Sequence, residues 1–412
     1  MKWPGALNRE EAAALALTAP AFLLSRFEFV LGSLALPDIQ ASLAVPEAAL
    51  TQLVAIARLG AVPAILIAIF ADRFDRRRML VSTIIGFALA SLATAFAQNA
   101  AQFAAAQAAS RLFTAADEIL CVVILVEAAR PQMRGWLAGL MAMAGGLGDG
   151  AASFAYGFSQ SMPGDWRGLF VCGAIAALPL VFVRVGARRL TNFGNARFKE
   201  SVGAVLRRYP GRVLAICAVF AIAMFPYSAT LSLMSKHLQS DFGYDRGAVA
   251  QLFIGAGAFA ILGNVAAGAL ADRIGRRVVF GVSLAVSAAA FMAFYLGTAQ
   301  TAPLFWTIAL FTAFMSHVSL SVFAAELFPA SARATVRALA DLAGVLGIAI
   351  GLVAESLVLP IVGSHAVAIA WLWPVVLLSI PLIFVALPET ARRDLKDIAP
   401  DGALQDVKRG NP

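Results

Sequence analysis

The chain has 412 residues and is strongly apolar, with 60% hydrophobic residues, 14% charged residues and a mean hydropathy of +0.81. Soluble globular proteins carry about 25% charged residues, so this composition excludes a soluble enzyme. Cys121, Cys172 and Cys217 lie inside apolar stretches, which argues against a disulfide framework and a thiolate metal site. The N-terminal residues lack the short apolar core and cleavage site of a signal peptide, so we expect the first apolar run to stay in the membrane.

Apolar runs bounded by charges, Pro and Gly predict twelve membrane spans, because a helix that crosses a bilayer needs about 20 apolar residues. They lie near 13–36, 49–71, 79–97, 101–126, 135–159 and 168–183, and near 213–235, 248–270, 278–297, 303–325, 334–359 and 366–387. The stretch between the two sets is rich in arginine, beginning with Arg184. We therefore expect an all-α integral membrane protein of twelve transmembrane helices in two pseudo-symmetric six-helix halves. Its parts are an N-terminal half over 1–183, a basic cytoplasmic connector over 184–212, and a C-terminal half with a short cytoplasmic tail over 213–412.

The basic residues predict the topology, because loops rich in Lys and Arg stay cytoplasmic. With both termini inside, the outer loops contain three of the 32 Lys and Arg residues, namely Arg167, Lys236 and Arg246. Three more fall within spans, and the others lie in inner segments. The net charge of +8 is thus explained by topology rather than by a nucleic-acid partner. We expect a multi-pass protein of the bacterial inner membrane with both termini cytoplasmic.

An internal repeat of about 200 residues relates the two halves. Residues 268–277 read GALADRIGRR and follow the eighth span, and residues 68–77 read AIFADRFDRR and follow the second. Glu127 closes the fourth span as Glu326 closes the tenth, and each is followed by a proline and an arginine. Duplicated halves are a common construction among transporters.

The GxxxDRxGRR pattern at 268–277, its degenerate copy at 68–77 and the twelve-span layout resemble the major facilitator superfamily of secondary transporters. The resemblance covers essentially the whole chain, although Ala68 and Asp75 stand where the first copy is expected to have glycines. It implies alternating access about a central site, and a cytoplasmic gate in which motif arginines pair with acids at neighbouring helix ends. The alternative is that these arginines anchor the loops to lipid phosphates. The gate residues are Asp72, Arg73, Arg76, Arg77, Glu127, Asp272, Arg273, Gly275, Arg276, Arg277, Glu326 and Arg333.

Charged side chains inside a membrane are costly, so their positions are informative. Spans three, six, nine and twelve contain none, as expected from the superfamily fold, where the third helix of each triplet lies against lipid. The others hold Arg26, Glu28, Arg58, Arg111, Asp117, Glu118, Asp149, Asp341 and Glu355, with His317 in span ten.

The candidates for substrate binding are Arg26, Arg58, Arg111, Asp149 and His317. For each there is a structural alternative. Arg111 can belong to a permanent ion pair, and His317 can be a lone polar side chain hydrogen-bonded within the bundle. Asp149 lies among four glycines, where it can cap a locally distorted helix at a close approach of backbones.

The candidates for proton coupling are Glu28, Glu118 and Asp117. Arg111 and Glu118 are seven residues apart, which places them on nearly one helix face, whereas Asp117 points about 100° away. A carboxylate beside an arginine in a low-dielectric cavity can exchange its proton for a salt bridge. The alternative is a permanent ion pair between packed helices, which is favoured for Asp117.

Two branches of the superfamily share features with this chain. The first-span acid and the Arg and Glu of span four are similar to Spinster-like members. The endings Glu326-Leu-Phe-Pro329 and Pro388-Glu389-Thr390 are similar to sugar porters and related metabolite–proton symporters. Both branches stay open at this point.

The leading function is a proton-coupled secondary transporter of a small solute, and the three arginines inside spans favour an organic anion. A sugar transporter and proton-coupled efflux of lipid-like or drug-like amphiphiles are the alternatives. Because the sequence lacks HExxH, GxSxG and GxxxxGK[ST] motifs, we expect neither an enzyme nor a metal or other cofactor. The expected partners are the solute, protons and the lipid bilayer, with the protein working as a monomer.

Overall fold

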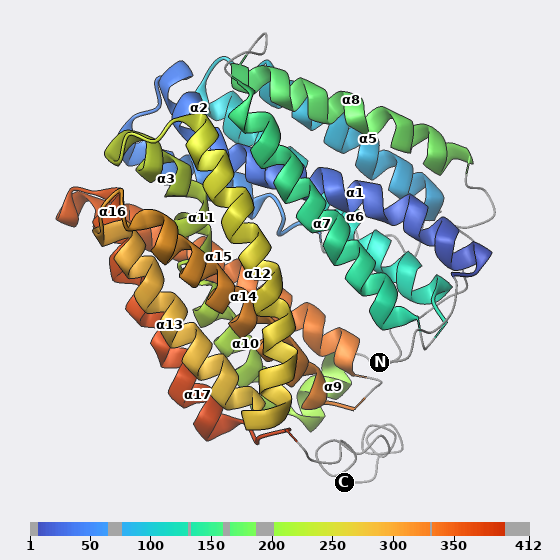
Figure 1. The fold of residues 1–412 in the computed structure, drawn as a ribbon. Helices are drawn as coiled ribbons and strands as arrows, with labels where there is room; N and C mark the ends of the chain where they lie inside the picture. The colour runs from blue at the N-terminus through green and yellow to red at the C-terminus, as the bar shows by residue number, and fades with distance from the viewer. Residues whose placement is uncertain are drawn as a thin grey trace. The chain divides into compact units, whose positions relative to one another are not determined.

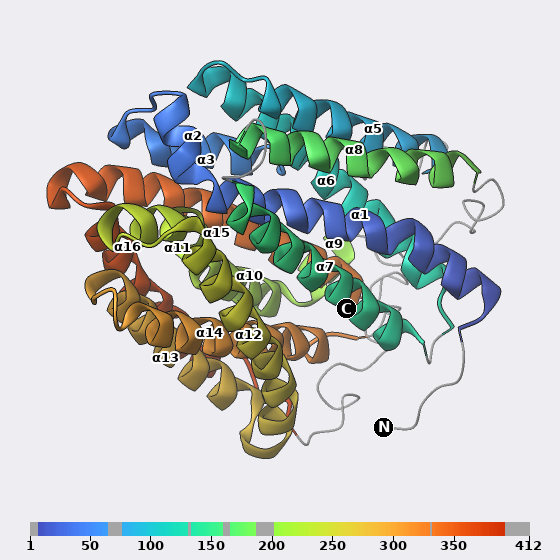
Figure 2. The same cartoon turned by 45° about the horizontal axis from the view of Figure 1, so that its top comes forward.

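The computed structural model describes residues 7–64, 76–130, 133–159, 165–186, 202–329 and 332–391, and within these ranges the chain is helical with no strand (Figures 1 and 2). It divides into two compact units. Unit 1 comprises Met1–Ala196 and Met234–Ile254, and unit 2 comprises Arg197–Leu233 and Gly255–Pro412. In the described ranges nine helices are long and apolar enough to cross a membrane, or ten if the bent pair α2 and α3 forms one span.

Unit 1 is built around its first helix. Its helices are α1 (Arg9–Leu34), α2 (Leu36–Ser42), α3 (Glu47–Leu59), α5 (Arg76–Ala95), α6 (Ala100–Ala128), α7 (Arg134–Gly157) and α8 (Asp165–Gly186). The first helix begins at a capping box, in which the Glu11 backbone N–H donates to Asn8 Oδ1 at 2.8 Å and the Asn8 N–H donates to Glu11 Oε2 at 3.0 Å. α1 packs against α6, α7 and α8, so residues on α1 are well placed to meet side chains from several helices.

Unit 2 contains most of the second repeat. Its helices are α9 (Val202–Arg208), α10 (Pro210–Met224), α13 (Arg276–Leu296), α14 (Ala302–Glu326), α15 (Arg333–Val362), α16 (His365–Leu372), the 3₁₀ segment η3 (Trp373–Leu378) and α17 (Ser379–Ala386). α11 (Tyr227–Lys236) and α12 (Arg246–Ile274) belong partly to each unit, and the π-helical segment η2 (His237–Asp241) follows α11. The predicted seventh and twelfth spans are thus interrupted helices, with Pro226 and Pro374 at the interruptions, because proline lacks the N–H that continues a helix.

Glycines mark equivalent close helix contacts in the two units. A Cβ on Gly148 of α7 would lie 2.2 Å from the Leu23 carbonyl oxygen of α1, and one on Gly347 of α15 would lie 2.1 Å from the Ala221 oxygen of α10. Only glycine permits backbones to approach this closely. The two glycines are about 200 residues apart, like the sequence motifs, so the repeat is also a repeat of packing. The same holds for Gly60 against Ala108 and Gly263 against Phe311.

Helix α8 continues to Gly186, into the stretch that the sequence assigned to the connector. Arg184 therefore lies inside a helix and is 1% exposed, which corrects the expectation that the sixth span carries no charge. Carboxylate and carbonyl oxygens around its guanidinium satisfy the buried charge. The central connector residues 187–201 lie outside the described ranges.

Candidate substrate and coupling site

Three arginine side chains converge on one phenyl ring in unit 1. The guanidinium carbon of Arg58 lies 3.7 Å from the centroid of the Phe29 ring, that of Arg111 lies 4.8 Å away, and that of Arg26 lies 5.0 Å away. Phe29 and Arg26 belong to α1, Arg58 to the last turn of α3, and Arg111 to α6. We call these three arginines and Phe29 the arginine cluster. A cation near an aromatic face is attracted by the ring quadrupole, so the Phe29 ring attracts all three guanidinium groups.

Arg26 also forms a two-pronged ion pair with Asp149 of α7. Its Nε and Nη2 atoms each donate to one carboxylate oxygen at 2.9 Å. The pair is partly exposed, with 32% and 24% of the two side chains accessible. Helix α7 runs without a break from Arg134 to Gly157, so the expected local distortion at Asp149 is wrong. The expected close approach of backbones is present at the neighbouring Gly148.

Glu28 lies beside the arginine cluster but points to neutral donors. It is 3% exposed, and its Oε1 atom accepts hydrogen bonds from Ser110 Oγ at 2.6 Å and from Gln107 Nε2 at 3.3 Å. The charge of Glu28 also interacts electrostatically with Arg111. A buried carboxyl group with neutral hydrogen-bond donors is a chemically reasonable place to hold a proton.

Glu118 is held by α1 through a different contact. Its Oε1 atom accepts a short hydrogen bond from Ser25 Oγ, and its charge interacts with Arg111. Helix α6 is continuous over both residues, so the predicted seven-residue spacing does place Arg111 and Glu118 along one helix. The Nε atom of Arg111 is buried and has no hydrogen-bond acceptor among the described residues.

Asp117 faces another partner, which the sequence did not indicate. Arg184 Nη1 donates to Asp117 Oδ1 at 2.6 Å, and Arg184 Nη2 donates to Oδ2 at 2.9 Å. Thr83 Oγ1 donates to Oδ1 at 2.6 Å, while Arg184 Nη1 also donates to the Leu80 carbonyl oxygen at 2.7 Å. This buried pair ties α6 to α8 and α5. An unbroken apolar run up to Arg184 was the available signal that the residue could lie in a helix.

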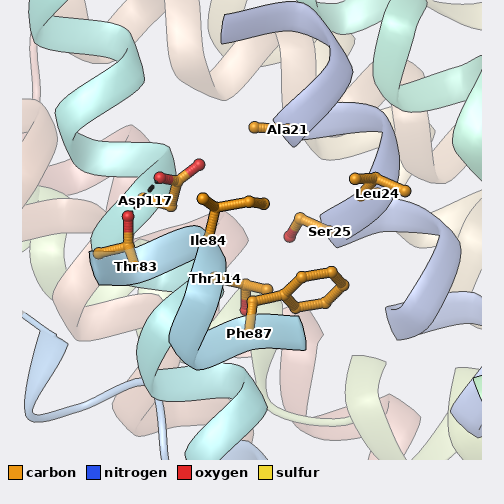
Figure 3. Close-up of a pocket in the computed structure, with 8 residues that line it drawn as sticks. All are labelled: Ala21, Leu24, Ser25, Thr83, Ile84, Phe87, Thr114 and Asp117. Atoms are coloured by element: carbon orange, nitrogen blue, oxygen red, sulfur yellow. Dashed lines mark hydrogen bonds between the residues drawn. The ribbon is translucent and has the colours of Figure 1, made fainter. Parts of the chain in front are cut away.

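A small pocket separates the Glu118 contact from the Asp117 pair. It lies between α1, α5 and α6, and its polar lining comes from Ser25, Thr83, Thr114 and Asp117 (Figure 3). Figure 3 shows Thr83 next to Asp117, with Ser25 entering from α1 on the other side. The rest of the lining is apolar and comes from Ala21, Leu24, Ile84 and Phe87.

His317 belongs to unit 2 and lies in a pocket of that unit. The lining comes from α10, α11, α13, α14 and η3 and includes Tyr227, Ser287, Ser316 and Trp373. The imidazole packs edge-on to Phe220 with 6.5 Å between ring centroids. Phe220 is in turn approached by the Arg337 guanidinium, which pairs with Asp341 at 2.9 Å.

The loop motif of unit 2 forms an ion-pair network. Arg276 Nε and Nη2 each donate to one oxygen of Glu326 at 3.0 Å, and Arg276 Nη2 lies 2.7 Å from Asp272 Oδ1. The turn needs Gly275, whose φ of +105° is unfavourable for other residues. Arg273 is exposed at this turn, whereas Arg333 Nε donates to the Phe328 carbonyl oxygen at 3.1 Å rather than to an acid.

Glu389 completes this network, a role that the sequence did not indicate. Its oxygens accept from the backbone N–H groups of Arg276 and Arg277 at 3.1 and 3.2 Å, and from those of Thr390 and Ala391 at 2.9 and 3.0 Å. Burial raises the pKa of Glu389, but these four backbone donors outweigh it and leave the pKa below its usual value.

In unit 1 the corresponding network lies largely outside the described residues. Asp72 and Arg73 fall in the undescribed stretch, as do the side chains of Arg76, Arg77 and Glu127. A different ion pair is described near this end of α6. Arg130 Nη2 lies 2.8 Å from Glu11 Oε2, and hydrogen bonding to Glu11 raises the pKa of Arg130.

At the other end of unit 1, two of the three basic residues assigned to outer loops are bound by acids. Arg246 donates from Nη2 to Asp38 and from Nη1 to Asp165, and Lys236 Nζ lies 3.0 Å from Glu47 Oε2. Arg246 is at the start of α12, so residues from the second repeat pair here with α2, α3 and α8. We call these contacts the outer network. Nothing in the local sequence indicated these long-range pairs.

The described residues contain no group of three or more His, Cys, Asp or Glu side chains suited to a metal ion. The helical bundle, its repeated packing and its long apolar helices define a multi-pass membrane protein. The sequence pattern of the Major Facilitator Superfamily matches residues 18–228 and 216–408. The chain belongs to this superfamily.

One relative and two solved structures are similar to this chain. The probable 4-methylmuconolactone transporter of Cupriavidus pinatubonensis (strain JMP 134 / LMG 1197) is 28% identical over 279 residues, which is 65% of this chain and 64% of that relative. The match thus spans less than two thirds of the relative's length. A D-xylose–proton symporter has a similar fold, with a TM-score of 0.76, 17% identity, and coverage of 92% of this chain and 98% of the symporter. A bacterial homologue of the human lysosomal transporter Spinster, inward-facing and unoccupied, has a TM-score of 0.70, 14% identity, and coverage of 92% and 96%.

Proposed function

We propose that this chain transports a small organic anion together with a proton, and that the arginine cluster binds the anion. The observation that carries the proposal is the convergence of Arg26, Arg58 and Arg111 on Phe29. Guanidinium groups are well suited to carboxylates because their planar donors match the two carboxylate oxygens. The name of the relative from Cupriavidus pinatubonensis supports a solute of this kind.

The balance of charge around the cluster supports proton coupling. Three guanidinium groups are accompanied by the carboxyl groups of Asp149, Glu28 and Glu118. When all six groups are ionised, their charges cancel, and an additional anion would leave a negative charge in a low-dielectric site. Protonation of one carboxyl group restores neutrality when a monoanion binds. A proton and an anion then enter together.

Glu118 and Glu28 are the carboxyl groups that we propose for the proton. Both interact with Arg111, and both are hydrogen-bonded by hydroxyl groups, from Ser25 and Ser110 respectively. Asp117 is instead bound on both oxygens by Arg184, which supports a structural role for it.

Further proposals concern the two halves of the chain, additional substrate contacts and the cytoplasmic gate. We propose that 1–183 and 213–412 act as the two moving halves of a monomer, with both termini cytoplasmic in the bacterial inner membrane. Asp149 and His317 are proposed as further substrate contacts. The Arg276 network and its counterpart around Arg76 are proposed to bias the cytoplasmic gate toward closure.

Uptake into proteoliposomes tests the substrate class. The liposomes receive 4-methylmuconolactone, benzoate or D-xylose, with and without an inward proton gradient. We expect the two carboxylates to accumulate and the gradient to increase their accumulation. Uptake of D-xylose alone would favour the sugar alternative. Transport of neither class, with export of an amphiphilic dye, would favour amphiphile efflux.

Two variants test the residues. Arg58→Ala should raise the KM for the carboxylate at least tenfold, whereas Arg167→Ala, an arginine outside the cluster, should leave it unchanged. Glu118→Gln should abolish uptake driven by the pH gradient and spare counterflow, which needs only substrate exchange.

If Glu118 is only structural, its loss destabilises the protein, and both activities fall with the melting temperature. A stable Glu118→Gln variant that still concentrates substrate would exclude Glu118 and leave Glu28 as the next carboxyl group to test.

A further inference from the structure

We propose that Phe29 is a positioning residue of the anion site: through cation–π contacts it holds the three guanidinium groups together at the place where the substrate binds. The choice of a carboxylate as the ligand rests on the function proposed above, whereas the arrangement of the side chains does not. Phe29 was not among the residues indicated by the sequence, because one phenylalanine in an apolar helix is indistinguishable from a lipid-facing residue.

Phe29 shares one face of α1 with two polar side chains. Arg26, Phe29 and Ser33 are spaced by three and four residues, so they lie along one face of the helix. Arg26 meets the ring from one position, and Arg58 is held between the ring and Ser33, whose Oγ accepts from Arg58 Nη2 at 3.0 Å. Arg111 of α6 completes the set. One face of α1 therefore fixes arginines that come from three helices.

A phenyl ring and a carboxylate differ in how they engage the hydrogen-bond donors of an arginine. All five N–H donors of a guanidinium lie in its plane, and a carboxylate partner occupies two of them. Asp149 does this to Arg26, using Nε and Nη2. A phenyl ring, by contrast, attracts the cation without accepting an N–H in this way. The buried Arg111 Nε, which has no acceptor among the described residues, is an example of a donor left available.

The three positive charges also repel one another. Their guanidinium carbons lie within 5.0 Å of one centroid, and Arg58 interacts electrostatically with both Arg26 and Arg111. The π quadrupole of Phe29 offsets part of this repulsion for all three cations. An aliphatic side chain of similar size fills the same space without the quadrupole, so the arginines would separate or turn away.

This arrangement makes a prediction about specificity. Because the arginines already surround the ring, Phe29 acts through them and does not stack on the substrate. Removal of the ring should therefore weaken the binding of aromatic and saturated carboxylates equally. If Phe29 stacked on the substrate directly, only the aromatic carboxylate would bind more weakly.

The first test compares Phe29→Leu and Phe29→Tyr with Phe27→Leu, a matched change on the same helix that points toward Gly173 of α8. The probes are benzoate and cyclohexanecarboxylate, and the readouts are KM, kcat and melting temperature. We expect Phe29→Leu to raise both KM values about tenfold, at little cost to kcat or melting temperature, and Phe29→Tyr to restore them. A loss confined to benzoate, or an unchanged KM, would overturn the proposal.

The second test needs no substrate. Phenylglyoxal labels arginines, and peptide mass spectrometry can follow each site in detergent. We expect labelling of Arg58 and Arg111 to be several-fold faster in Phe29→Leu than in the wild type or in Phe27→Leu. Unchanged labelling would overturn the positioning role. Faster labelling in a protein that transports neither carboxylate would refute the anion function and retain the positioning role.

Discussion

Replacing Arg184 by methionine should strongly destabilise unit 1, because it strands the carboxylate of Asp117. In the structure the two side chains are 1% and 8% exposed, and they share two charge-assisted hydrogen bonds of 2.6 and 2.9 Å. Without Arg184, the described donors to Asp117 are Thr83 Oγ1 at 2.6 Å and Cys121 Sγ at 3.5 Å. Neither of these donors carries a positive charge.

The size of the effect follows from which partner remains. Breaking a buried ion pair by removing one member costs about 3–5 kcal/mol, whereas replacing both members by apolar residues of similar volume is often close to neutral. Arg184→Met should therefore lower the free energy of unfolding by about 3–5 kcal/mol. Adding Asp117→Leu should recover most of that loss, so the double variant should be about 2–3 kcal/mol more stable than Arg184→Met.

Equilibrium unfolding in detergent micelles with increasing mole fractions of sodium dodecyl sulfate, followed by circular dichroism, measures these differences. Arg167→Met serves as the control for a change of the same type at a residue outside the pair. An Arg184→Met variant as stable as this control, or a double variant whose loss equals the sum of the single losses, would refute the reasoning. A stable Asp117→Asn variant that lacks pH-driven uptake would assign the proton to Asp117 instead.

Cysteines introduced at positions 192 and 300 should react with a membrane-impermeant maleimide from opposite sides of the membrane, as the distribution of basic residues predicts; labelling from one side would contradict the topology. Arg276→Ala should slow turnover more than it weakens substrate binding, because the role proposed for the Glu326 network is to bias conformations without contacting the substrate; an equal loss of affinity would place Arg276 in the binding site. Glu389→Gln should lower the melting temperature at pH 7. Because the folded pKa of Glu389 lies below its ordinary value of 4.5, its stabilisation is present above that value and is lost as the pH falls through the lowered pKa. The difference between wild type and variant should therefore vanish in acid, and a difference that grows there would contradict this origin.

Local patterns in the sequence predicted the helical membrane fold and the three arginines of the arginine cluster. Long apolar runs and costly charges are properties of single segments, so Arg26, Arg58 and Arg111 stood out without knowledge of packing. The superfamily was predicted from the repeated loop motif and is confirmed by the family match. The roles assigned to individual site residues stay predictions.

What the sequence missed depends on partners distant in the chain. The sequence assigned Arg184 to a polar loop, because a charged residue at the end of an apolar run can belong either to the helix or to the loop that follows it. Its burial depends on Asp117, 67 residues earlier. Phe29 carried no local signal at all. The partners of Arg246 are 208 and 81 residues away, a relation that no periodicity in one sequence encodes.

The glycine contacts between α1 and α7, and between α10 and α15, have a practical use in spectroscopy. A backbone oxygen that lies where a Cβ would otherwise stand leaves those helices little freedom to slide past each other. Spin labels placed on α1 and α7 should report nearly the same distance in every step of the transport cycle. Such a pair would serve as an internal ruler, against which distances between labels elsewhere in the protein can be calibrated.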